Sequence, residues 1–516
     1  GDDGDNLDVY VKIIGAGEPV RLTKNEADDI NPGFAPDGRF IAFVRSLPTT
    51  IDVILISALG GAERKLATLR ASRSGLSFAP DGKTLAVADN DSTRSETGIF
   101  LLDVETGAKR RVTSPPQFSS DSEPHYSPDG KSIAFVRAAS PIAQELYVVS
   151  SDRGEARPLT ADKTQIRGIA WNADGRHIVF ASLRASNQLN LWDIAAGGGE
   201  PVLIATGGKN PSNPAVSPDG KSIAYVEATN DANIWQIEFI DSAAKRSARR
   251  KLIASSRADH SPHFSPDGGR VVFASDRTGN YEIWVADANG ANTRPLTDLK
   301  TSAAGTPRFS PDGKFVVFDA QTDGKGDVFI VGAEGGRPRN LTAHAAHDVL
   351  PSWSADGRSV YFCPDRSGER QIWKISADGN GGDEAMQITR QGGFESFASP
   401  DGKEIFYTKN RGVAGIWRGS IDGAEETAVA ELAEASYWRY WSVGPAGIYF
   451  VARATGPPFT IRFFSLATKQ VSDAAQIEHT PLWIYPGLAA APDGQTLLYA
   501  QSDQNTGSIM LAELGK

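Results

Sequence analysis

The sequence has few of the residues that build disulfides, metal centres and reactive thiols. Its 516 residues include one cysteine, two methionines and seven histidines. The single cysteine, Cys363, excludes an intramolecular disulfide and every metal site built from cysteine pairs. Because Cys363 ends the apolar run Val360-Tyr361-Phe362, we expect an inert thiol buried in a strand.

Long apolar runs and a surplus of positive charge are also missing. No stretch of 18 apolar residues occurs, so we expect no membrane insertion of this segment. The opening residues 1–5, Gly-Asp-Asp-Gly-Asp, lack the basic and apolar regions of a secretory signal. The net charge of −10 argues against nucleic acid as a partner, because affinity for nucleic acid relies on neutralising phosphates.

Catalytic signatures are equally scarce. The nearest approach to a Gly-x-Ser-x-Gly nucleophile elbow is residues 75–79, which lie before a hairpin turn rather than between a strand and a helix. The many glycines sit at turns and form no phosphate-binding loop. We therefore expect no catalytic residues, no resident metal and no cofactor.

A ten-residue pattern, typified by residues 127–136, is repeated along the whole chain. Each copy centres on an Asp-Gly pair, except that Pro445-Ala446-Gly447 replaces one of them. Subtraction of successive positions gives steps of 44 to 48 residues. The Asp residues of the pairs are Asp37, Asp81, Asp129, Asp174, Asp219, Asp267, Asp312, Asp356, Asp401 and Asp493.

Each copy reads as a tight turn followed by a buried strand. Proline presets φ, Asp accepts hydrogen bonds from nearby N–H groups, and Gly supplies the positive φ of a bulged hairpin. The apolar runs that follow, such as residues 41–44 and 271–274, are rich in β-branched and aromatic types. A third strand with an aromatic and a short fourth strand ending in Leu-Thr complete the unit. Four short antiparallel strands about every 45 residues predict an all-β fold, the β-propeller.

The units resemble the PD40, or TolB-type, propeller repeat. The resemblance rests on segments such as residues 262–268, Pro-His-Phe-Ser-Pro-Asp-Gly, and 275–284, Ser-Asp-Arg-Thr-Gly-Asn-Tyr-Glu-Ile-Trp, and it covers nearly the whole chain. The succession of blades looks like the extracytoplasmic propeller region of bacterial membrane-anchored regulators that carry a winged-helix or Ser/Thr-kinase domain. The resemblance implies a periplasmic or extracytoplasmic location and a protein or peptide partner in the cell envelope.

About twelve four-stranded units fit the chain, counting a half unit at the start. Single propellers usually have four to eight blades, which favours two tandem six-bladed propellers over one large ring. We predict a first propeller over residues 1–254 that starts in the middle of a blade, and a second over residues 255–516. The basic segment 241–251 is interpreted as a solvated connector. Residues 489–514 are expected to supply the first three strands of a last blade, with the fourth donated from near the N-terminus.

Candidate binding residues gather in the segments that enter the first strand of each unit. In a propeller this strand borders the central channel, so we place these segments at the channel mouth. An acid lies eight residues before the turn Asp in four units, and a Pro that fits a stiff, extended entry recurs three residues further on. Five of the seven histidines are found there. The predicted ligand-binding rim consists of Asp29, Asp121, His125, Asp259, His260, His263, His344, His347 and Asp348.

Alternative roles stay open for several of these residues. The His260-x-x-His263 pair and the segment 344–348 could bind Zn²⁺ or Mn²⁺, and the acids alone Ca²⁺. Because Asp and Pro recur as part of the repeat, we expect them instead to tie each loop to its blade. Asp276-Arg277 and Asp365-Arg366 are each expected to brace their own hairpin. The aromatic segments 437–441 and 483–486 either fill the core between blades or form a recognition surface.

These features predict a non-catalytic sensor or interaction module that binds a protein, peptide or small ligand at the channel mouth. Two alternatives are a metal-dependent lyase or glycoside-active enzyme that uses the rim His and Asp residues, and the substrate-gating propeller of a peptidase. The fold alone does not choose among them.

Overall fold

The computed structural model is built almost entirely of β-strands. It describes residues 7–47, 50–70, 75–90, 96–116, 119–139, 143–152, 154–184, 189–205, 210–241, 246–255, 257–300, 303–321, 325–364, 366, 370–379, 385–410, 413–423, 425–435, 437–454, 457–479, 481–482 and 486–514. Within these ranges there are 43 strands and one 3-10 helix, Ala430–Leu432. No helix in the described ranges is long and apolar enough to cross a membrane. Most sheets have four antiparallel strands in sequence order, as in the blades of a propeller.

The chain forms two compact units. The first comprises Gly1–Ala228 with Gly507–Lys516, and the second comprises Thr229–Thr506. This division differs from the predicted boundary after residue 254. The chain passes from the first unit to the second within one long strand and returns within another, so neither passage is marked by a loop.

The first unit contains four complete blades and a two-stranded sheet. The two-stranded sheet consists of β1 (Tyr10–Ile13) and β2 (Ala16–Arg21). It lies at the start of the chain, where the sequence predicted a half blade. The first strands of the blades contact one another in the order β3, β7, β11, β15, and β15 contacts β19 (Pro211–Val216). The four blades are β3 (Asp29–Phe34), β4 (Phe40–Ser46), β5 (Ile51–Ser57) and β6 (Arg64–Leu69); β7 (Leu76–Phe78), β8 (Thr84–Asp89), β9 (Gly98–Asp103) and β10 (Lys109–Arg111); β11 (Ser120–Tyr126), β12 (Ser132–Ala138), β13 (Gln144–Ser150) and β14 (Arg157–Pro158); and β15 (Ile166–Trp171), β16 (His177–Ser182), β17 (Asn190–Ala195) and β18 (Val202–Ile204).

The second unit is a closed ring of six blades. The first strands contact one another in the cyclic order β22, β26, β30, β34, β38, β42 and back to β22. Five blades are consecutive in sequence. They are β22 (Asp259–Phe264), β23 (Arg270–Ser275), β24 (Glu282–Asp287) and β25 (Arg294–Pro295); β26 (Ala304–Phe309), β27 (Phe315–Gln321), β28 (Gly326–Gly332) and β29 (Arg339–Asn340); β30 (Val349–Trp353), β31 (Ser359–Cys363), β32 (Trp373–Ser376) and β33 (Met386–Gln387); β34 (Ser396–Ala398), β35 (Glu404–Tyr407), β36 (Trp417–Ser420) and β37 (Glu426–Ala428); and β38 (Trp441–Val443), β39 (Gly447–Val451), β40 (Phe459–Ser465) and β41 (Val471–Ile477).

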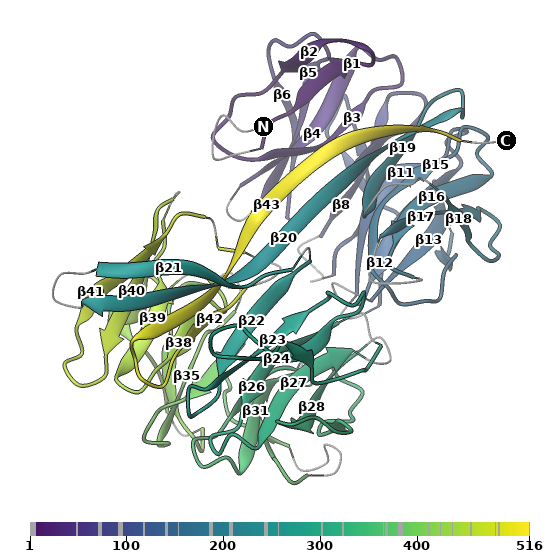
Figure 1. Cartoon of the computed structure of the whole chain (residues 1–516). Coiled ribbons are helices and arrows are strands. Elements are labelled where there is room, and N and C mark those ends of the chain that lie inside the picture. Colours follow the sequence, from purple (N-terminus) through teal and green to yellow (C-terminus); the bar gives the residue numbers. More distant parts are fainter. Residues whose placement is uncertain are drawn as a thin grey trace. The chain divides into compact units, whose positions relative to one another are not determined.

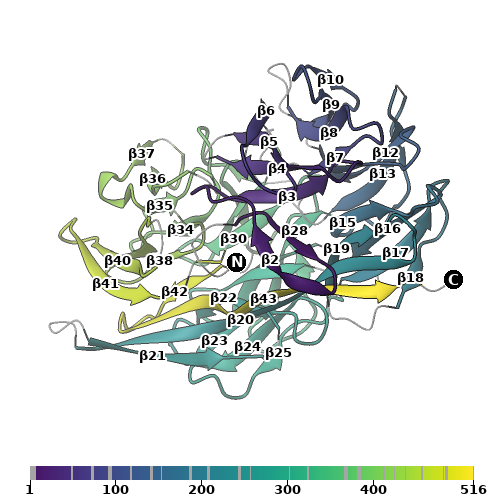
Figure 2. The ribbon, with the colours of Figure 1, turned by 90° about the horizontal axis from the view of Figure 1, so that it is seen from above.

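The sixth blade is assembled from segments far apart in sequence. Two long strands, β20 (Ser222–Asp241) and β43 (Thr496–Glu513), lie side by side in one sheet (Figures 1 and 2). In the second unit, β42 (Leu488–Ala490) pairs with the start of β43, and the end of β20 pairs with β21 (Arg246–Ile253). In the first unit, the start of β20 pairs with β19. The ring of the second unit is therefore closed by residues from both ends of its sequence.

Three expectations about these strands were wrong. Residues 496–513 form one continuous strand rather than the second and third strands of a blade. Of the basic segment 241–251, residues 246–251 lie in a strand rather than a connector, and residues 242–245 lie outside the described residues. The missing partners come from residues 234–253 and not from near the N-terminus. Local patterns predict strands but carry no information on which distant strand completes a sheet, and that choice depends on burial in the folded ring.

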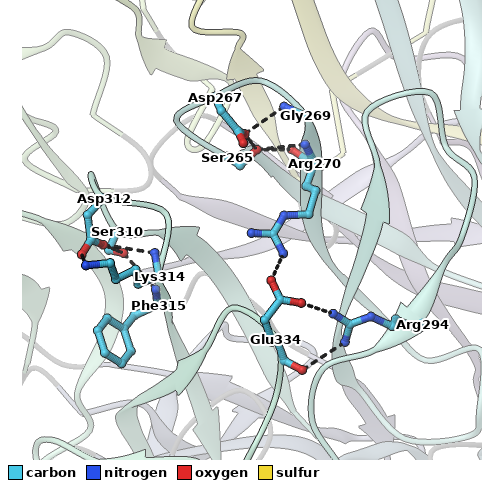
Figure 3. Close-up of polar contacts among 10 residues, drawn as sticks. All are labelled: Ser265, Asp267, Gly269, Arg270, Arg294, Ser310, Asp312, Lys314, Phe315 and Glu334. Atoms are coloured by element: carbon cyan, nitrogen blue, oxygen red, sulfur yellow. Dashed lines mark hydrogen bonds and ion pairs between the residues drawn. The ribbon is translucent and has the colours of Figure 1, made fainter.

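The recurring Asp-Gly turns are built as the sequence predicts. Asp267 accepts a hydrogen bond from the Gly269 N–H at 3.0 Å and another from the Ser265 hydroxyl, while Gly268 has φ of 70°. Figure 3 shows this arrangement beside the equivalent turn at Asp312. The same N–H contact to Asp is present in all ten Asp-Gly turns. The repeated Asp is thus used for the hairpin, not for a ligand.

Apolar packing joins neighbouring blades. Val272 of β23 and Phe318 of β27 are fully buried and belong to one apolar cluster shared by two blades. Burying a large apolar side chain contributes about 1.5–3 kcal/mol. At the surface, the exposed Glu334 binds Arg270 and Arg294 of the preceding blade (Figure 3). Cys363 is buried in β31, as predicted.

Candidate functional site

The four predicted rim aspartates are buried and bind an arginine of their own blade. The pairs are Asp29–Arg45 (2.7 Å), Asp121–Arg137 (2.7 Å), Asp259–Arg277 (2.7 Å) and Asp348–Arg366 (2.6 Å). Each arginine also stacks on aromatic rings. The Arg137 guanidinium carbon, for example, lies 5.5 Å from the Phe135 ring centre and 4.6 Å from that of Tyr147. These aspartates tie the first strand to the second, because their carboxylates are held by a strong charge-assisted contact.

The expected brace between Asp276 and Arg277 is wrong. Arg277 reaches back across the hairpin to Asp259, eighteen residues earlier. Asp276 instead accepts the Ala258 N–H at 2.9 Å, and burial raises its pKa. The equivalent Arg366 binds Asp348, and Asp365 lies outside the described residues.

On β22 of the second unit, the side chain of His260 is buried and that of His263 is partly buried. The Nδ1 atom of His260 lies 2.7 Å from the Ser261 hydroxyl oxygen. Burial, with the positive charge of Arg439 nearby, lowers the pKa of His260 to about 3. The His263 Nδ1 accepts the Phe309 N–H of the next blade at 3.2 Å, and burial lowers its pKa to about 3 as well. Both imidazoles therefore remain uncharged at neutral pH.

The other rim histidines do not join them in a metal site. The His347 Nδ1 accepts the Gly326 N–H at 2.7 Å, and the His344 Nδ1 accepts the Ala346 N–H at 3.0 Å. His125 belongs to the first unit, where burial lowers its pKa to about 4. Across the described ranges, no group of three or more His, Cys, Asp or Glu residues is arranged to hold a metal ion. Each residue of the predicted rim thus makes its own local contact, and the described rim residues do not form one shared metal site.

The first strands are bulged just before their recurring prolines, where the sequence suggested a stiff, extended entry. The residue before each proline has left-handed φ, and the pairing register shifts there. These residues are Asn31 (51°), Glu123 (51°), Asn213 (48°), Ser261 (56°), Thr306 (53°) and Leu350 (58°). Asn tolerates this conformation, whereas β-branched Thr306 and bulky Leu350 are strained. Such strain costs about 1–3 kcal/mol for each residue.

The bulges bring neighbouring first strands into close contact. A Cβ atom added to Gly487 would lie 2.9 Å from the Ser261 Cα and 2.7 Å from the Pro262 ring. At Gly168 in the first unit, it would lie 2.5 Å from the Asn213 Cα. Only glycine fits at these two positions, because the neighbouring backbone occupies the space of a side chain.

A buried group of charged residues lies on these first strands in the second unit. Arg308 is on β26, Glu395 directly precedes β34, and Arg439 lies two residues before β38. The Arg308 Nη2 lies 3.2 Å from Glu395 Oε1, and the Arg439 Nε lies 3.7 Å from the same oxygen. The other Glu395 oxygen accepts the Arg439 backbone N–H at 3.0 Å and the Trp441 indole N–H at 2.9 Å. We refer to Arg308, Glu395 and Arg439, with Asp319 of β27, as the central charge cluster.

Burial shapes the charges of the central charge cluster. The exposed fractions of Arg308, Glu395 and Arg439 are 8%, 2% and 7%. Burial lowers the pKa of Arg308 to about 10 and also lowers that of Arg439, with Glu395 opposing both changes. Burial raises the pKa of Asp319, whose carboxylate accepts the Leu350 N–H at 2.7 Å. Arg439 itself has left-handed φ of 60°, so the cluster lies among the strained residues.

Sequence reasoning missed this cluster, although one signal was present. Arg308 follows Pro307 as His263 follows Pro262, so both occupy the same position of the repeat. Attention to histidines alone left out Arg308. Arg439 and Glu395 lie in units that depart from the repeat, and no spacing in the sequence links them to Arg308.

The aromatic segment 437–441 mainly fills the core. Trp438, Tyr440 and Trp441 are buried, and the edge of the Trp441 ring packs against Phe397 with ring centres 4.5 Å apart. Residues 483–485 of the second aromatic segment lie outside the described residues. The core interpretation of residues 437–441 therefore agrees with their burial.

Family models match most of the propeller region. The model described as PD40, TolB beta propeller domain, matches residues 77–304. The model of the Tricorn protease N-terminal beta propeller domain matches residues 282–428. The chain contains TolB-type β-propeller repeats. The repeats seen in the sequence, the turns and the four-stranded blades all agree with this family.

The matches to curated relatives cover only part of the chain. The Tol-Pal system protein TolB of Francisella tularensis is 28% identical over 243 residues, which are 44% of this chain and 51% of the relative. The uncharacterized peptidase YuxL of Bacillus subtilis is 27% identical over 206 residues, 39% of this chain and 29% of the relative. The matched regions thus span about half of the one relative and less than a third of the other.

The chain also has partial similarity to solved structures. A putative TolB from Agrobacterium tumefaciens has a TM-score of 0.45 at 18% identity, over 53% of this chain and 99% of that one. The tricorn protease has a TM-score of 0.34 at 11% identity, over 98% of this chain and 61% of that one.

Proposed function

We propose that the chain is a non-catalytic binding module that takes a protein or peptide segment at the channel mouth of the second propeller. The observation that carries the proposal is the central charge cluster among strained residues on the inner strands of a closed ring. Left-handed Thr306, Leu350 and Arg439 cost stability, and strain of this kind concentrates at binding and catalytic sites. Burying two arginines also costs desolvation. A ligand explains these costly features better than stability does.

Several observations favour binding over catalysis. A general base works best with a pKa near the working pH, whereas the pKa values of His260 and His263 are about 3. Both imidazoles serve local contacts, and the rim aspartates are held by arginines. The metal-dependent lyase interpretation therefore loses the residues on which it rested. By the resemblance to TolB-type repeats, we place the module in the periplasm or another extracytoplasmic space, with its partner in the cell envelope.

A substrate-gating role for a peptidase is the second candidate. It is favoured by the match of residues 282–428 to the Tricorn N-terminal propeller model. In that case the same channel would admit a peptide temporarily, and binding would be weak and broad in sequence.

The test is site-specific photo-crosslinking to a pool of N-acetylated random hexapeptides. A photoreactive amino acid replaces the exposed His344, at the predicted rim, or the half-exposed Met386 of β33, a fourth strand, as a control. We expect saturable labelling from position 344 that excess unlabelled pool suppresses, and little labelling from position 386. Equal labelling from both positions, or none, would refute a peptide site at the channel mouth.

A further inference from the structure

The central charge cluster indicates the chemistry of the ligand. We propose that the second propeller recognises a carboxylate group of its peptide ligand, held by the guanidinium groups of Arg439 and Arg308. This inference rests on the proposed peptide-binding function and specifies which group of the peptide is bound.

The Arg439 guanidinium has hydrogen-bond donors that no described residue accepts. Among the described residues its guanidinium makes one ion pair, to Glu395 at 3.7 Å, and donates no hydrogen bond. Its Nε is enclosed without a hydrogen-bond partner. A guanidinium carries five N–H donors, and leaving them unsatisfied in a buried place is costly. About 8% of the side-chain surface stays exposed, so part of the side chain remains in contact with solvent.

Arg308 shares this property. It donates one hydrogen bond to Glu395 through Nη2, at 3.2 Å, and its Nε is enclosed without a partner. Its guanidinium carbon lies 4.0 Å from the ring centre of Phe397, so the side chain is held firmly in place. A positioned guanidinium loses little entropy on binding an anion. Two such groups near one carboxylate leave capacity for a second carboxylate.

A carboxylate fits the cluster better than a phosphate. Glu395 is itself a carboxylate held by both arginines and the Trp441 indole, so this geometry already accommodates the group. The cluster pairs two arginines with two acids, Glu395 and Asp319. The neighbouring His260 and His263 add no positive charge, because burial keeps them neutral. A doubly charged phosphate would face two acids, whereas a single carboxylate adds one charge to an arginine pair suited to bidentate binding.

The carboxylate can belong to the C-terminus of a peptide or to an acidic side chain, and three pools of N-acetylated hexapeptides separate these sources. The first pool has a free C-terminal carboxylate and no acidic side chain. The second is C-terminally amidated and contains one Glu, and the third is amidated without any acid. Binding of each pool to the whole chain is measured by isothermal titration calorimetry. We expect at least about tenfold tighter binding for one carboxylate-bearing pool than for the third.

Variants of Arg439 test whether the preference for carboxylate-bearing peptides arises from the central charge cluster. Arg439→Gln should abolish it, and Arg439→Lys, which keeps the charge without the planar fork, should reduce it. The control is Arg462→Gln, because Arg462 is a partly exposed arginine of the same unit. Thermal melts identify any variant that does not fold, and Arg439→Lys decides if Arg439→Gln is unfolded.

Each outcome is informative. Equal binding of all three pools would overturn the carboxylate inference and leave the peptide-binding function standing. No binding of any pool would overturn both. A carboxylate preference that persists in Arg439→Lys and Arg439→Gln would show that the preference arises elsewhere.

Discussion

Replacing Asp121 with Asn tests whether the rim aspartates are structural braces. Asp121 and Arg137 are directly opposite each other on β11 and β12, and their side chains are joined by contacts of 2.7 and 2.9 Å. The Asp121 side chain is fully buried, whereas 15% of the Arg137 side chain is exposed. The substitution keeps the size of the side chain and removes its charge, so Arg137 is left buried without its partner.

The expected loss follows from burial. Removing one partner of a buried ion pair costs about 3–5 kcal/mol. Because water still reaches part of Arg137, we expect the low end, about 3 kcal/mol. For a unit of this size, 1 kcal/mol corresponds to about 2–4 °C in melting temperature. The transition of the first unit should therefore fall by about 6–12 °C.

The assay is thermal unfolding followed by tryptophan fluorescence and near-ultraviolet circular dichroism. Glu200→Gln is the control, because Glu200 is 98% exposed and lies 3.9 Å from Arg184. Exposed pairs of this kind contribute no more than about 1 kcal/mol. The double variant Asp121→Ala/Arg137→Met should lose less stability than Asp121→Asn, since it leaves no unpaired charge.

Two results would refute this reasoning. One is a loss for Asp121→Asn no larger than that for Glu200→Gln. The other is a double variant less stable than the single one. Either result would show that the rim aspartates are not structural braces and would leave them as candidates for ligand binding.

Three further predictions concern the second unit and metals. The pKa of His263 is lowered to about 3 in the folded state, so the unfolded chain binds the proton more readily. The free energy of unfolding should therefore have its full value above about pH 6.5 and fall toward pH 3, by up to about 1.4 kcal/mol per pH unit. Measured melts of His263→Gln should show a shallower fall than wild type, and equal slopes would contradict the assignment. Gly487→Ala should destabilise the ring by about 1–3 kcal/mol in urea unfolding, because the added Cβ has no space. Gly197→Ala is the control, because a Cβ added there would have no atom within 4 Å. Equal losses of stability in the two variants would count against ring closure at Gly487. Zn²⁺, Mn²⁺ and EDTA should leave the melting temperature unchanged, and a rise with metal that EDTA reverses would show a site that the described residues do not form.

Much of the fold could be predicted from the sequence because most blades are formed by residues close together in the chain. An Asp-Gly turn needs only neighbouring residues, and all ten predicted turns have the same hydrogen bond from backbone N–H to Asp. The apolar runs after them are the buried second strands, such as β23 and β27. The hairpin of β1 and β2 lies at the start of the chain, where a half unit was predicted. Each of these features extends over fewer than fifty residues.

The candidate site was predicted less well, because its residues act through distant partners. The rim segments were the right place to look for buried polar groups, yet Asp259 turned out to hold Arg277 and His263 to accept a backbone N–H. The cluster of Arg308 and Glu395 joins residues 87 positions apart. No local spacing reports such a contact.

The sequence by itself determined the repeating blade, its turns and its buried strands, because those depend on periodicity and on the conformational preferences of Pro, Asp and Gly. Only the tertiary structure decided that β20 and β43 close the second ring together. It also decided that Arg308, Glu395 and Arg439 meet at the inner strands. Strand partners and buried charge contacts are set by the closing of the ring, which brings together residues that the chain keeps far apart.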